Sequence, residues 1–441
     1  MEDAYIIKGG KALRGDVYLS GAKNIALKTI IAALLFSSDV VLENIPRIGD
    51  VYELIHLIEK LGVNCEFIKK NTLYIDNSGL RFNKIDLLHA AKIRVSFMLF
   101  APLLYKFGQC FIPNPGGCRI GARSIDRIIE GMKFLGANII YNHGTGYYES
   151  KLVNKPKGKY VFKKPTHTGT ELIIMFSIFA DGTIDLINAA QEPEIDDLIN
   201  FLNEGGAKIK KKGNRIIIKG VNQLRQKKPF IISSDRNEAV TFATLGIASK
   251  GLVTLKNIEK NQLNIFIDKV KETGSGINII KDNGIEFFYK DEIKPVGIET
   301  EPHPGFMTDW QPNWAVFMTQ SNGDSVIHER VYENRFSYVS ELKKLGANID
   351  FVDPLISNPK DYYYFNYKET ETYQQAITIH GGAPLHGGAI VTNDLRAGAS
   401  LTTGALLARG ESIIYGASII ERGYEDFVKK VSDLGGEIKK I

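Results

Sequence analysis

Six copies of one helix–glycine–strand pattern are the strongest constraint on how this 441-residue chain can fold. In each copy a helical run ends at a glycine, and a short strand-like segment follows. A glycine in that place predicts a left-handed residue directly after the end of a helix. The repetition therefore predicts one supersecondary unit copied six times. The six glycines are Gly62, Gly136, Gly206, Gly274, Gly346 and Gly435, at intervals of 74, 70, 68, 72 and 89 residues.

A second element repeats in phase with the first, namely a polar segment that opens an apolar helix. The polar segments are residues 20–24, 92–94, 166–170, 234–236, 308–310 and 393–396. Polar residues often cap helices, but Lys23, Arg94 and Arg396 are not of the capping types. Helix starts carry partial positive charge and attract anions. Three units in each half predict two similar α/β domains, with several helix starts facing a ligand cleft between them.

The composition excludes several classes of protein. With 44% hydrophobic and 24% charged residues, the chain is neither disordered nor fibrous. It contains neither an apolar stretch of about 18 residues nor a secretory signal, so we expect a cytoplasmic protein without a membrane partner. Three cysteines suit a reducing compartment. A net charge of +5, spread along the chain, does not indicate a nucleic-acid partner. The oligomeric state is not predicted.

The segment from Pro113 to Arg123 carries the most informative cysteine. Three glycines lie in it, and Arg119 and Arg123 follow Cys118 closely. Neighbouring cations lower the pKa of a cysteine and favour the reactive thiolate. Cys65 and Cys110 lie instead in strand-like segments, where a cysteine is usually a small buried apolar residue. Cys118 is therefore the candidate reactive thiol.

Motifs for phosphate-loop, dinucleotide and zinc binding are missing from the sequence, so we expect no cofactor and no metal. What remains is a set of cations accompanied by a few carboxylates. Arginines bind carboxylates and phosphates through two parallel hydrogen bonds, which predicts a small substrate with several negative charges. The set comprises Lys23, Arg94, Arg123, Arg335, Arg396 and Arg422, with Asp235, Glu192, Asp309 and Asp394.

At these residues the chain resembles the enolpyruvyl transferases, and within them the branch that uses UDP-N-acetylglucosamine. The matching segments span nearly the whole chain: residues 19–24, 115–123, 188–194, 235–238, 303–309, 332–336, 394–397 and 421–424. The resemblance implies a two-domain inverse (inside-out) α/β barrel of six βαβαββ units, three per domain. We expect residues 1–22 and 236–441 to form one domain. Residues 23–235, with the Cys118 loop, are expected to form the other.

The resemblance also implies a reaction, the transfer of the enolpyruvyl group of phosphoenolpyruvate to the 3′-hydroxyl of UDP-N-acetylglucosamine with release of phosphate. That is the first committed step of peptidoglycan precursor synthesis. Cys118 would be the acid and Asp309 the base. Phosphoenolpyruvate would bind Lys23, Asn24, Arg123, Arg335, Arg396 and Arg422. The nucleotide sugar would bind Arg94, Arg123, Ser124, Ile125, Asp126, Arg127, Lys164, Pro165, Thr166, His167, Thr168, Asp309 and Val331. Asp235, Glu192 and Asp394 would organise the cleft.

Some positions depart from the pattern of that family. His167 lies in a segment that often reads Ser-Val-Gly-Ala, and Ile128 lies where histidine is common. Both fall on the acceptor side, which leaves two alternatives: an enolpyruvyl transferase for another uridine-containing acceptor, and a catalytically silent nucleotide-sugar sensor. An insertion near residues 357–388 contains a tyrosine-rich run, which we interpret as a surface strand and turn.

Overall fold

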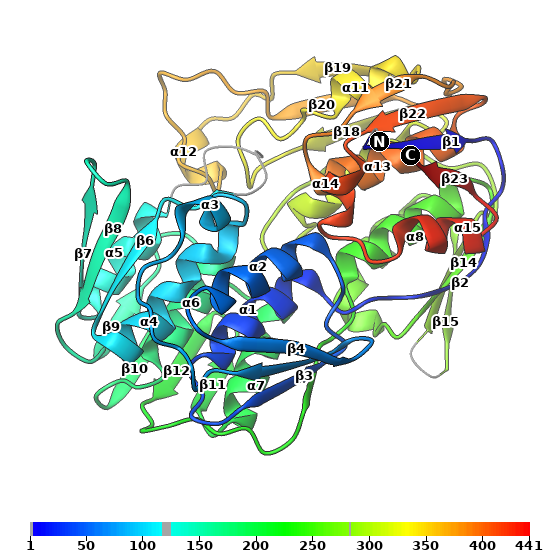
Figure 1. Ribbon diagram of the computed structural model, residues 1–441. Helices are drawn as coiled ribbons and strands as arrows, with labels where there is room; N and C mark the ends of the chain where they lie inside the picture. Colours follow the sequence, from blue (N-terminus) through cyan, green and yellow to red (C-terminus); the bar gives the residue numbers. More distant parts are fainter. Residues whose placement is uncertain (1–2, 117–124, 282–283) are drawn as a thin grey trace. The chain divides into compact units, whose positions relative to one another are not determined.

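The computed structural model describes residues 3–116, 125–281 and 284–441 (Figure 1). The chain divides into two compact units. We call residues 21–116 and 125–233 the N-unit, and the other described residues, 3–20 and 234–441, the C-unit. The chain passes from one unit to the other after residue 20 and again after residue 233.

The described part of the N-unit contains three sheets, with strand orders β13-β3-β5-β4, β6-β8-β7 and β11-β12-β10-β9. Their strands are β3 (Val40–Glu43), β4 (Asn64–Lys69), β5 (Thr72–Asp76), β6 (Gln109–Pro113), β7 (Ala137–Asn142), β8 (Tyr147–Leu152), β9 (Gly158–Val161), β10 (Thr183–Ile187), β11 (Lys208–Lys212), β12 (Arg215–Lys219) and β13 (Phe230–Ile231). In the last sheet β9 runs parallel to β10, and β12 pairs antiparallel with both β10 and β11.

The C-unit, as far as it is described, also has three sheets, with orders β21-β22-β1-β23, β15-β16-β14-β2 and β17-β18-β20-β19. Their strands are β1 (Ala4–Lys8), β2 (Arg14–Tyr18), β14 (Leu252–Lys256), β15 (Gly276–Ile280), β16 (Gly284–Phe288), β17 (Ile298–Glu299), β18 (Asp324–His328), β19 (Asn348–Val352), β20 (Ala376–His380), β21 (Ala389–Val391), β22 (Glu411–Tyr415) and β23 (Glu437–Lys440). The N-terminal segment completes two of these sheets, because β1 pairs with β22 and β23 and β2 pairs with β14.

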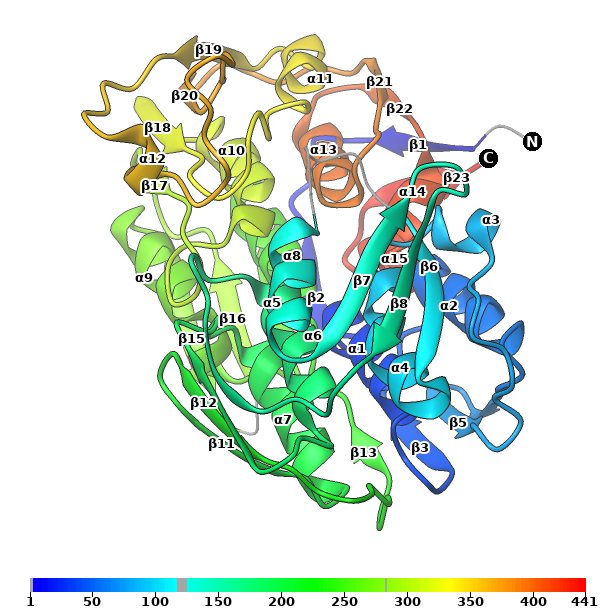
Figure 2. The same ribbon diagram turned by 90° about the vertical axis from the view of Figure 1, so that its left-hand side faces the viewer.

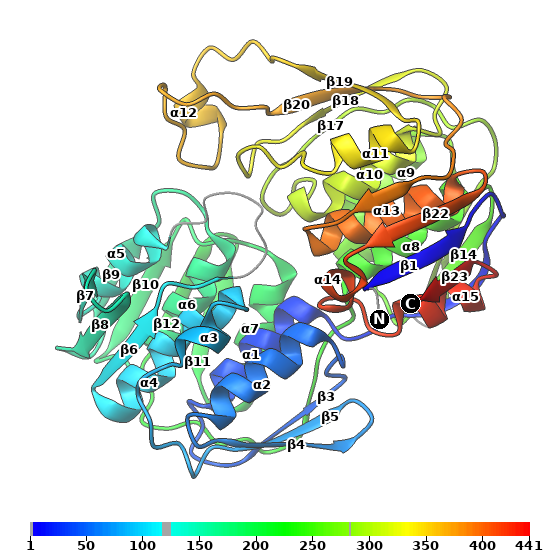
Figure 3. The same ribbon diagram turned by 45° about the horizontal axis from the view of Figure 1, so that its top comes forward.

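The first helix of each repeat lies inside its unit. These helices are α1 (Lys23–Ala33), η1 (Arg94–Leu99) continued by α4 (Phe100–Phe107), α6 (His167–Ser177), α8 (Arg236–Ala248), η3 (Thr308–Trp310) continued by α10 (Gln311–Met318), and α13 (Leu395–Leu407). Every residue of α8 and α10 is buried, and α8, α10 and α13 contact one another. Figure 3 shows these three helices between the sheets of the C-unit. Helices inside and sheets outside confirm the predicted inside-out α/β fold.

The second helix of each repeat is amphipathic and packs with one face on its unit. These helices are α2 (Gly49–Glu59), α5 (Asp126–Phe134), α7 (Pro193–Glu204), α9 (Asn264–Glu272), α11 (Val339–Lys344) and α15 (Phe427–Asp433). In α5, for example, Ile128, Ile129 and Met132 are buried, and the helix lies beside β7 (Figure 2). Four short helices complete the described chain: α3 (Leu87–Ala90), η2 (Lys260–Leu263), α12 (Pro359–Tyr362) and α14 (Ala417–Glu421).

The six repeat glycines all have the left-handed conformation that the sequence predicts. Their φ angles lie between 83° at Gly274 and 118° at Gly136. After α2, the Val63 N–H donates to the carbonyl of Ile58, which is the long-range bond of a glycine-terminated helix. The glycines therefore end the second helix of each repeat and turn the chain into the strand that follows.

The prediction for the tyrosine-rich insertion is wrong. Its tyrosine run begins in the short helix α12 and continues as irregular chain, and the next strand along the chain is β20. Tyr363 and Phe365 are buried, and the Tyr363 ring stacks on Tyr367 at 5.7 Å between centroids. Packing among aromatic rings, including the contact of Tyr363 with His328, replaces sheet pairing here.

Among the helices of the described residues, none is both long and apolar enough to cross a lipid bilayer.

Two repeat glycines provide a matched test of the left-handed helix ends. Gly62 and Gly206 have φ angles of +100° and +104°, but a methyl group on Gly62 would lie 2.2 Å from the carbonyl oxygen of Gly79, whereas one on Gly206 would meet nothing within 4 Å. We expect Gly206→Ala to lower the free energy of unfolding by about 1–2 kcal/mol, the cost of a left-handed non-glycine residue. Gly62→Ala should cost clearly more. Urea unfolding of both variants measures this, and equal losses would contradict the steric argument.

Candidate active site

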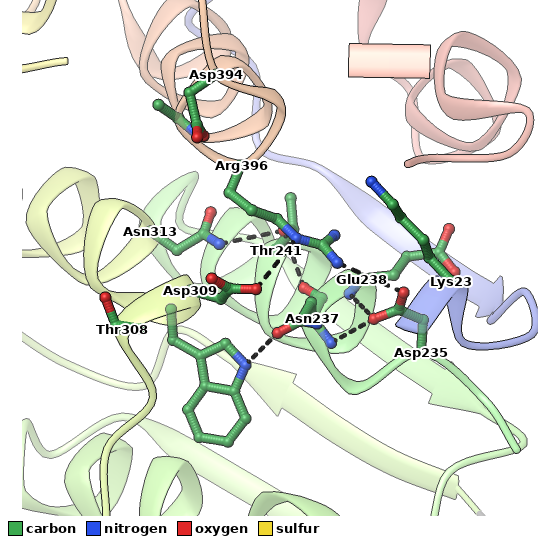
Figure 4. A network of polar contacts seen from close by, with 12 residues as sticks. Lys23, Asp235, Asn237, Glu238, Thr241, Thr308, Asp309, Asn313, Asp394 and Arg396 are labelled. Atoms are coloured by element: carbon green, nitrogen blue, oxygen red, sulfur yellow. Dashed lines mark hydrogen bonds and ion pairs between the residues drawn. The ribbon is translucent and has the colours of Figure 1, made fainter. Parts of the chain in front are cut away.

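The predicted site residues of the C-unit lie at the starts of its three inner helices. Asp235 caps α8 by accepting hydrogen bonds from the backbone N–H groups of Asn237 (2.7 Å) and Glu238 (3.2 Å). Asp394 caps α13 by accepting from the Ala397 N–H at 2.7 Å. Asp309 lies in η3, directly before α10. Because the three repeats pack their helices together, these starts meet (Figure 4).

Asp309 lies between two arginines, as Figure 4 shows for one of them. Its Oδ1 accepts a hydrogen bond from Arg335 Nη2 at 2.7 Å, and its Oδ2 lies 3.8 Å from Arg396 Nε. Arg396 also lies 3.7 Å from Asp235 through Nη2. The Asp309 side chain is 23% exposed, in contrast to 6% for Arg335 and 5% for Arg396. The cluster is thus a buried pair of guanidinium groups with one accessible carboxylate.

Both arginines remain charged although they are buried. Burial alone would lower the pKa of Arg335, but Asp309, Asp394 and Glu329 outweigh it and raise the pKa. Burial likewise opposes the charge of Arg396, whose pKa is raised by Tyr424, Asp235 and Asp309. The Nη1 of Arg396 is buried and has no hydrogen-bond partner among the described residues. A buried guanidinium donor of this kind is suited to an anionic ligand.

A polar network beneath the cluster fixes the three helices to one another (Figure 4). The indole of Trp310 donates to Asn237 Oδ1 at 2.9 Å, which connects η3 to α8. Asn313 of α10 donates to Thr241 Oγ1 of α8 at 3.2 Å and accepts from Ser400 Oγ of α13 at 2.9 Å. These buried bonds hold the helix starts, and so the charged side chains, in register.

Two further predicted residues of the C-unit lie outside this cluster. Arg422 is the half-buried residue at the C-terminal end of α14. Val331 follows β18, and its backbone N–H donates to Glu329 Oε1 at 2.7 Å.

In the N-unit, Lys23 is the first residue of α1 and is buried. Its Nζ lies 2.6 Å from Oδ2 of Asp50, near the start of α2. Asn24 follows Lys23 and is half-buried. The carboxylate of Asp50 compensates a lysine charge that the start of a helix would otherwise disfavour.

His167 opens α6 and belongs to a buried charged group that the sequence did not reveal. Its Nε2 lies 3.2 Å from Oε1 of Glu171, whose Oε2 lies 3.1 Å from Lys28 Nζ. Burial lowers the pKa of His167, but Glu171 and Glu192 outweigh burial and raise it above the usual value. Glu192 itself is buried at the N-terminal cap of α7.

The other predicted acceptor residues of the N-unit lie at helix starts. Arg94 opens η1 and lies over the Phe97 ring, and Ile125 precedes α5. Asp126 is exposed at the start of α5, whereas burial lowers the pKa of Arg127. Lys164, Pro165, Thr166 and Thr168 are half-buried around the start of α6.

Three predicted residues, Cys118, Arg123 and Ser124, lie outside the described residues. The other two cysteines are where we predicted them, Cys65 in β4 and the fully buried Cys110 in β6. Burial raises the pKa of Cys65 to about 12 and also raises that of Cys110. Among the described residues, no group of three His, Cys, Asp or Glu side chains is placed to hold a metal ion.

Sequence reasoning missed the residues that hold the charged ones. Asp50, Glu171 and Glu329 are buried partners of predicted site residues, and Lys28 is the buried partner of Glu171. None of the four stands in a recognisable motif. Their one sequence signal is a charge within an otherwise apolar helix or strand end, as at Lys28 and Glu171.

Fold and site together define a two-unit α/β protein whose C-unit holds two buried arginines beside an accessible aspartate. A family model described as EPSP synthase (3-phosphoshikimate 1-carboxyvinyltransferase) matches residues 7–431. The chain belongs to this family, the enolpyruvyl transferases, and is a transferase.

Two relatives of known name are similar to this chain over most of its length. The chain is 38% identical to the UDP-N-acetylglucosamine 1-carboxyvinyltransferase of Halothermothrix orenii over 99% of both chains. It is 40% identical to UDP-N-acetylglucosamine 1-carboxyvinyltransferase 1 of Caldanaerobacter subterraneus subsp. tengcongensis, over 79% of this chain and 83% of that one.

Two solved structures share the fold at low sequence identity. The enolpyruvyl transferase NikO from Streptomyces tendae superposes with a TM-score of 0.85 at 20% identity, covering 100% of this chain and 99% of that one. The EPSP synthase from Acinetobacter baumannii gives a TM-score of 0.71 at 18% identity, covering 100% of both chains.

The ion pair of His167 with Glu171 predicts a pH-dependent contribution to stability. Since the folded-state pKa of His167 is raised, the pair stabilises the fold fully below about pH 6.5, the unfolded value, and loses this effect as the pH rises through the folded-state pKa. We expect His167→Gln to lower the free energy of unfolding more at about pH 6 than at about pH 9. Urea unfolding at both pH values measures this. The control is His143→Gln, at an exposed histidine of the same unit; an equal loss at both pH values for His167→Gln would contradict the pairing.

Proposed function

We propose that this chain transfers the enolpyruvyl group of phosphoenolpyruvate to the 3′-hydroxyl of UDP-N-acetylglucosamine and releases phosphate. Relatives named for this reaction, one of them over 99% of both chains, support the proposal. The structural observation that carries it is the accessible Asp309 carboxylate between the buried guanidinium groups of Arg335 and Arg396. Such a site offers a proton acceptor beside fixed positive charge, which this reaction requires.

The arginine and lysine side chains account for binding of phosphoenolpyruvate. Arg335 and Arg396 hold its carboxylate, with the unpartnered Nη1 of Arg396 as one available donor. Lys23, Arg123 and Arg422 hold its phosphate together with Asn24, which follows Lys23 in the sequence. Guanidinium groups held by Asp235 and Asp309 need little reorganisation when the substrate binds.

The reaction needs one proton donor and one acceptor. Cys118 protonates the methylene carbon of phosphoenolpyruvate while the acceptor hydroxyl oxygen bonds to the adjacent carbon and gives its proton to Asp309. A proton then leaves the new methyl group, phosphate departs, and the carbon–carbon double bond forms again. General acid–base catalysis of this kind contributes roughly 10²–10⁴-fold to the rate.

The nucleotide sugar binds residues at the helix starts of the N-unit together with Asp309 and Val331. Arg94, Arg123, Arg127 and Lys164 offer positive charge, and the start of α6 at Thr166–Thr168 offers the backbone N–H groups of a helix N-terminus for the diphosphate. The remaining contacts with the nucleotide sugar come from Ser124, Ile125, Asp126 and Pro165. Asp394 organises the start of α13 as its cap, as Asp235 does at α8, and Glu192 lies at the start of α7, where its charge acts on His167.

The biological setting that we propose is the cytoplasm, where the reaction begins the synthesis of peptidoglycan precursors and so serves cell-wall growth and division. The test is release of phosphate from phosphoenolpyruvate by the purified chain. Release should depend on added UDP-N-acetylglucosamine and should fall when other uridine compounds replace it. If phosphate is released only with another uridine-containing acceptor, the proposed acceptor is wrong. If no phosphate is released with any acceptor, the proposed reaction is wrong.

Replacing Asp309 by asparagine should separate binding from chemistry. Asn cannot accept the hydroxyl proton, so we expect turnover to fall roughly 10²-fold or more, with UDP-N-acetylglucosamine binding close to normal. Phosphate release and titration calorimetry measure the two quantities. The control is Asp433→Asn, at an exposed carboxylate paired with Lys429. Turnover within a few-fold of wild type for Asp309→Asn would show that this aspartate is structural.

The three cysteines should differ in their reactivity towards the epoxide fosfomycin. We expect rapid alkylation of Cys118, faster still with the nucleotide sugar bound, and protection of Cys65 and Cys110, because burial raises the pKa of both thiols. Peptide mass mapping after timed exposure measures the labelling. Cys118→Ala should lose labelling and most turnover, whereas Cys118→Asp should keep activity and resist the drug. Equal labelling of all three cysteines would refute the assignment.

A further inference from the structure

Glu329 is a buried carboxylate to which the proposed chemistry assigns no part. It follows β18 directly and has 0% of its surface exposed. Its Oε1 accepts hydrogen bonds from Thr300 Oγ1 (2.8 Å), Val331 N (2.7 Å) and Tyr332 N (3.0 Å), and its Oε2 accepts from Thr308 Oγ1 (2.8 Å). Three donors thus converge on Oε1, and Thr308 alone donates to Oε2.

The hydroxyl of Thr308 connects Glu329 to the candidate active site. Arg335 Nη1 donates to Thr308 Oγ1 at 2.7 Å, and its Nη2 donates to Asp309 at 2.7 Å. Arginine has no acceptor, so Thr308 must accept from Arg335 and direct its own proton elsewhere. That proton goes to Glu329. The carboxylate thereby fixes the hydroxyl in the orientation in which Arg335 can bind it.

Glu329 also orders the backbone that carries Arg335. The N–H groups of Val331 and Tyr332 converge on its Oε1, which holds the turn after β18. On the other side of this turn, the buried Gln375 side chain donates to the carbonyls of Glu329 and Tyr332 at 2.7 and 2.9 Å. Arg335 thus leaves a turn that is fixed from two sides, and its guanidinium end is fixed through Thr308.

We propose that Glu329 is a positioning residue that acts through Thr308 to hold Arg335 and Asp309 in their reactive arrangement. The proposal rests on the proposed function, because it needs Arg335 to bind the substrate carboxylate and Asp309 to accept the proton. The geometry that carries the proposal is the donation of the Thr308 hydroxyl to Oε2 while Arg335 donates to the same hydroxyl. The pKa of Glu329 is raised above its usual value, because burial outweighs Arg335 and the hydrogen bonds that the side chain accepts.

Glu329→Gln tests the proposal with little change of shape. Its amide oxygen can still accept from the turn and from Thr300, but its NH₂ group would donate to Thr308, which then has no acceptor for its own proton. We expect kcat/KM for phosphoenolpyruvate to fall about 10–100-fold, the scale of a small misplacement of reacting groups. Thr308→Val should give a similar loss, and the double variant no more than the larger single loss, since both changes break one connection. Thr308→Ser, which keeps the hydroxyl, should stay within a few-fold of wild type.

Thr300→Val is the matched control. Thr300 also donates a hydroxyl hydrogen bond to Glu329 at 2.8 Å, but its other bond is from the backbone N–H of Arg330, not from Arg335. We expect this variant to lose stability on heating and to keep kcat/KM within a few-fold. Equal losses of kcat/KM in Thr300→Val and Thr308→Val would mean that Glu329 supports only the fold, and would overturn the proposal. Additive losses of kcat/KM in the double variant that combines Glu329→Gln with Thr308→Val would also overturn the proposal.

A crystal structure of Glu329→Gln separates this inference from the proposed function. We expect Arg335 to leave hydrogen-bond distance of Thr308, whereas in Thr300→Val it should stay. If Arg335 keeps both bonds in Glu329→Gln, the inference is wrong whatever the activity. If the wild-type chain releases no phosphate in the presence of acceptor, the proposed function fails, and the position of Arg335 still decides the inference. Should Glu329→Gln not fold, the comparison of Thr308→Val with Thr308→Ser and Thr300→Val decides it by the same criteria.

Discussion

The placement of the first helix of each repeat inside its unit is the constraint on which the rest of this structure depends. A helix surrounded by sheets and other helices has no solvent-facing side on which charged residues could lie. In α8, all thirteen residues are buried, from Arg236 to Ala248. Charge can therefore gather at the helix starts, where unpaired backbone N–H groups also need partners. The three-helix packing of the C-unit brings such starts together, and the arginine–aspartate cluster forms at that place.

The two units differ in whether the starts of their inner helices carry aspartates. In the N-unit the first residues of α1, η1 and α6 are Lys23, Arg94 and His167. A cation there opposes the helix dipole, so these positions cost stability unless an anion compensates. Asp50 and Glu171 supply part of the compensation. In the C-unit an aspartate stands in or beside the first turn of each inner helix, where the dipole favours it and where it can cap the helix. The inner helices of the N-unit therefore begin with cations, whereas those of the C-unit begin with aspartates accompanied by Arg236 and Arg396.

The sequence predicts those parts of the fold that repeat along the chain. The sequence predicts Gly346 and the five other repeat glycines, because the end of a helix requires a left-handed residue. It also predicts the polar segment before each inner helix, for a similarly local reason. Strand pairings between distant segments could not be predicted from the sequence. β1 and β2 join strands more than 230 residues away, and no local pattern identifies those partners. The tyrosine-rich insertion was predicted as a strand because tyrosine favours strands, but tertiary packing against His328 prevails. Glu329 escaped prediction for the same reason, since its partners come from three segments.

The energetics of the cluster favour a functional origin over a stabilising one. Arg335 and Arg396 are almost fully buried, and removing a guanidinium group from water costs several kcal/mol that a buried ion pair often does not recover. Apolar residues of similar volume would serve the core of the C-unit at least as well. The arrangement nevertheless keeps two guanidinium groups, leaves Nη1 of Arg396 without a partner among the described residues, and exposes only the Asp309 end to solvent. These features suit the function that we propose, an anion bound next to a proton acceptor. Preorganised charge in a buried site stabilises a transition state without further rearrangement. A cluster selected for stability alone would not retain all three.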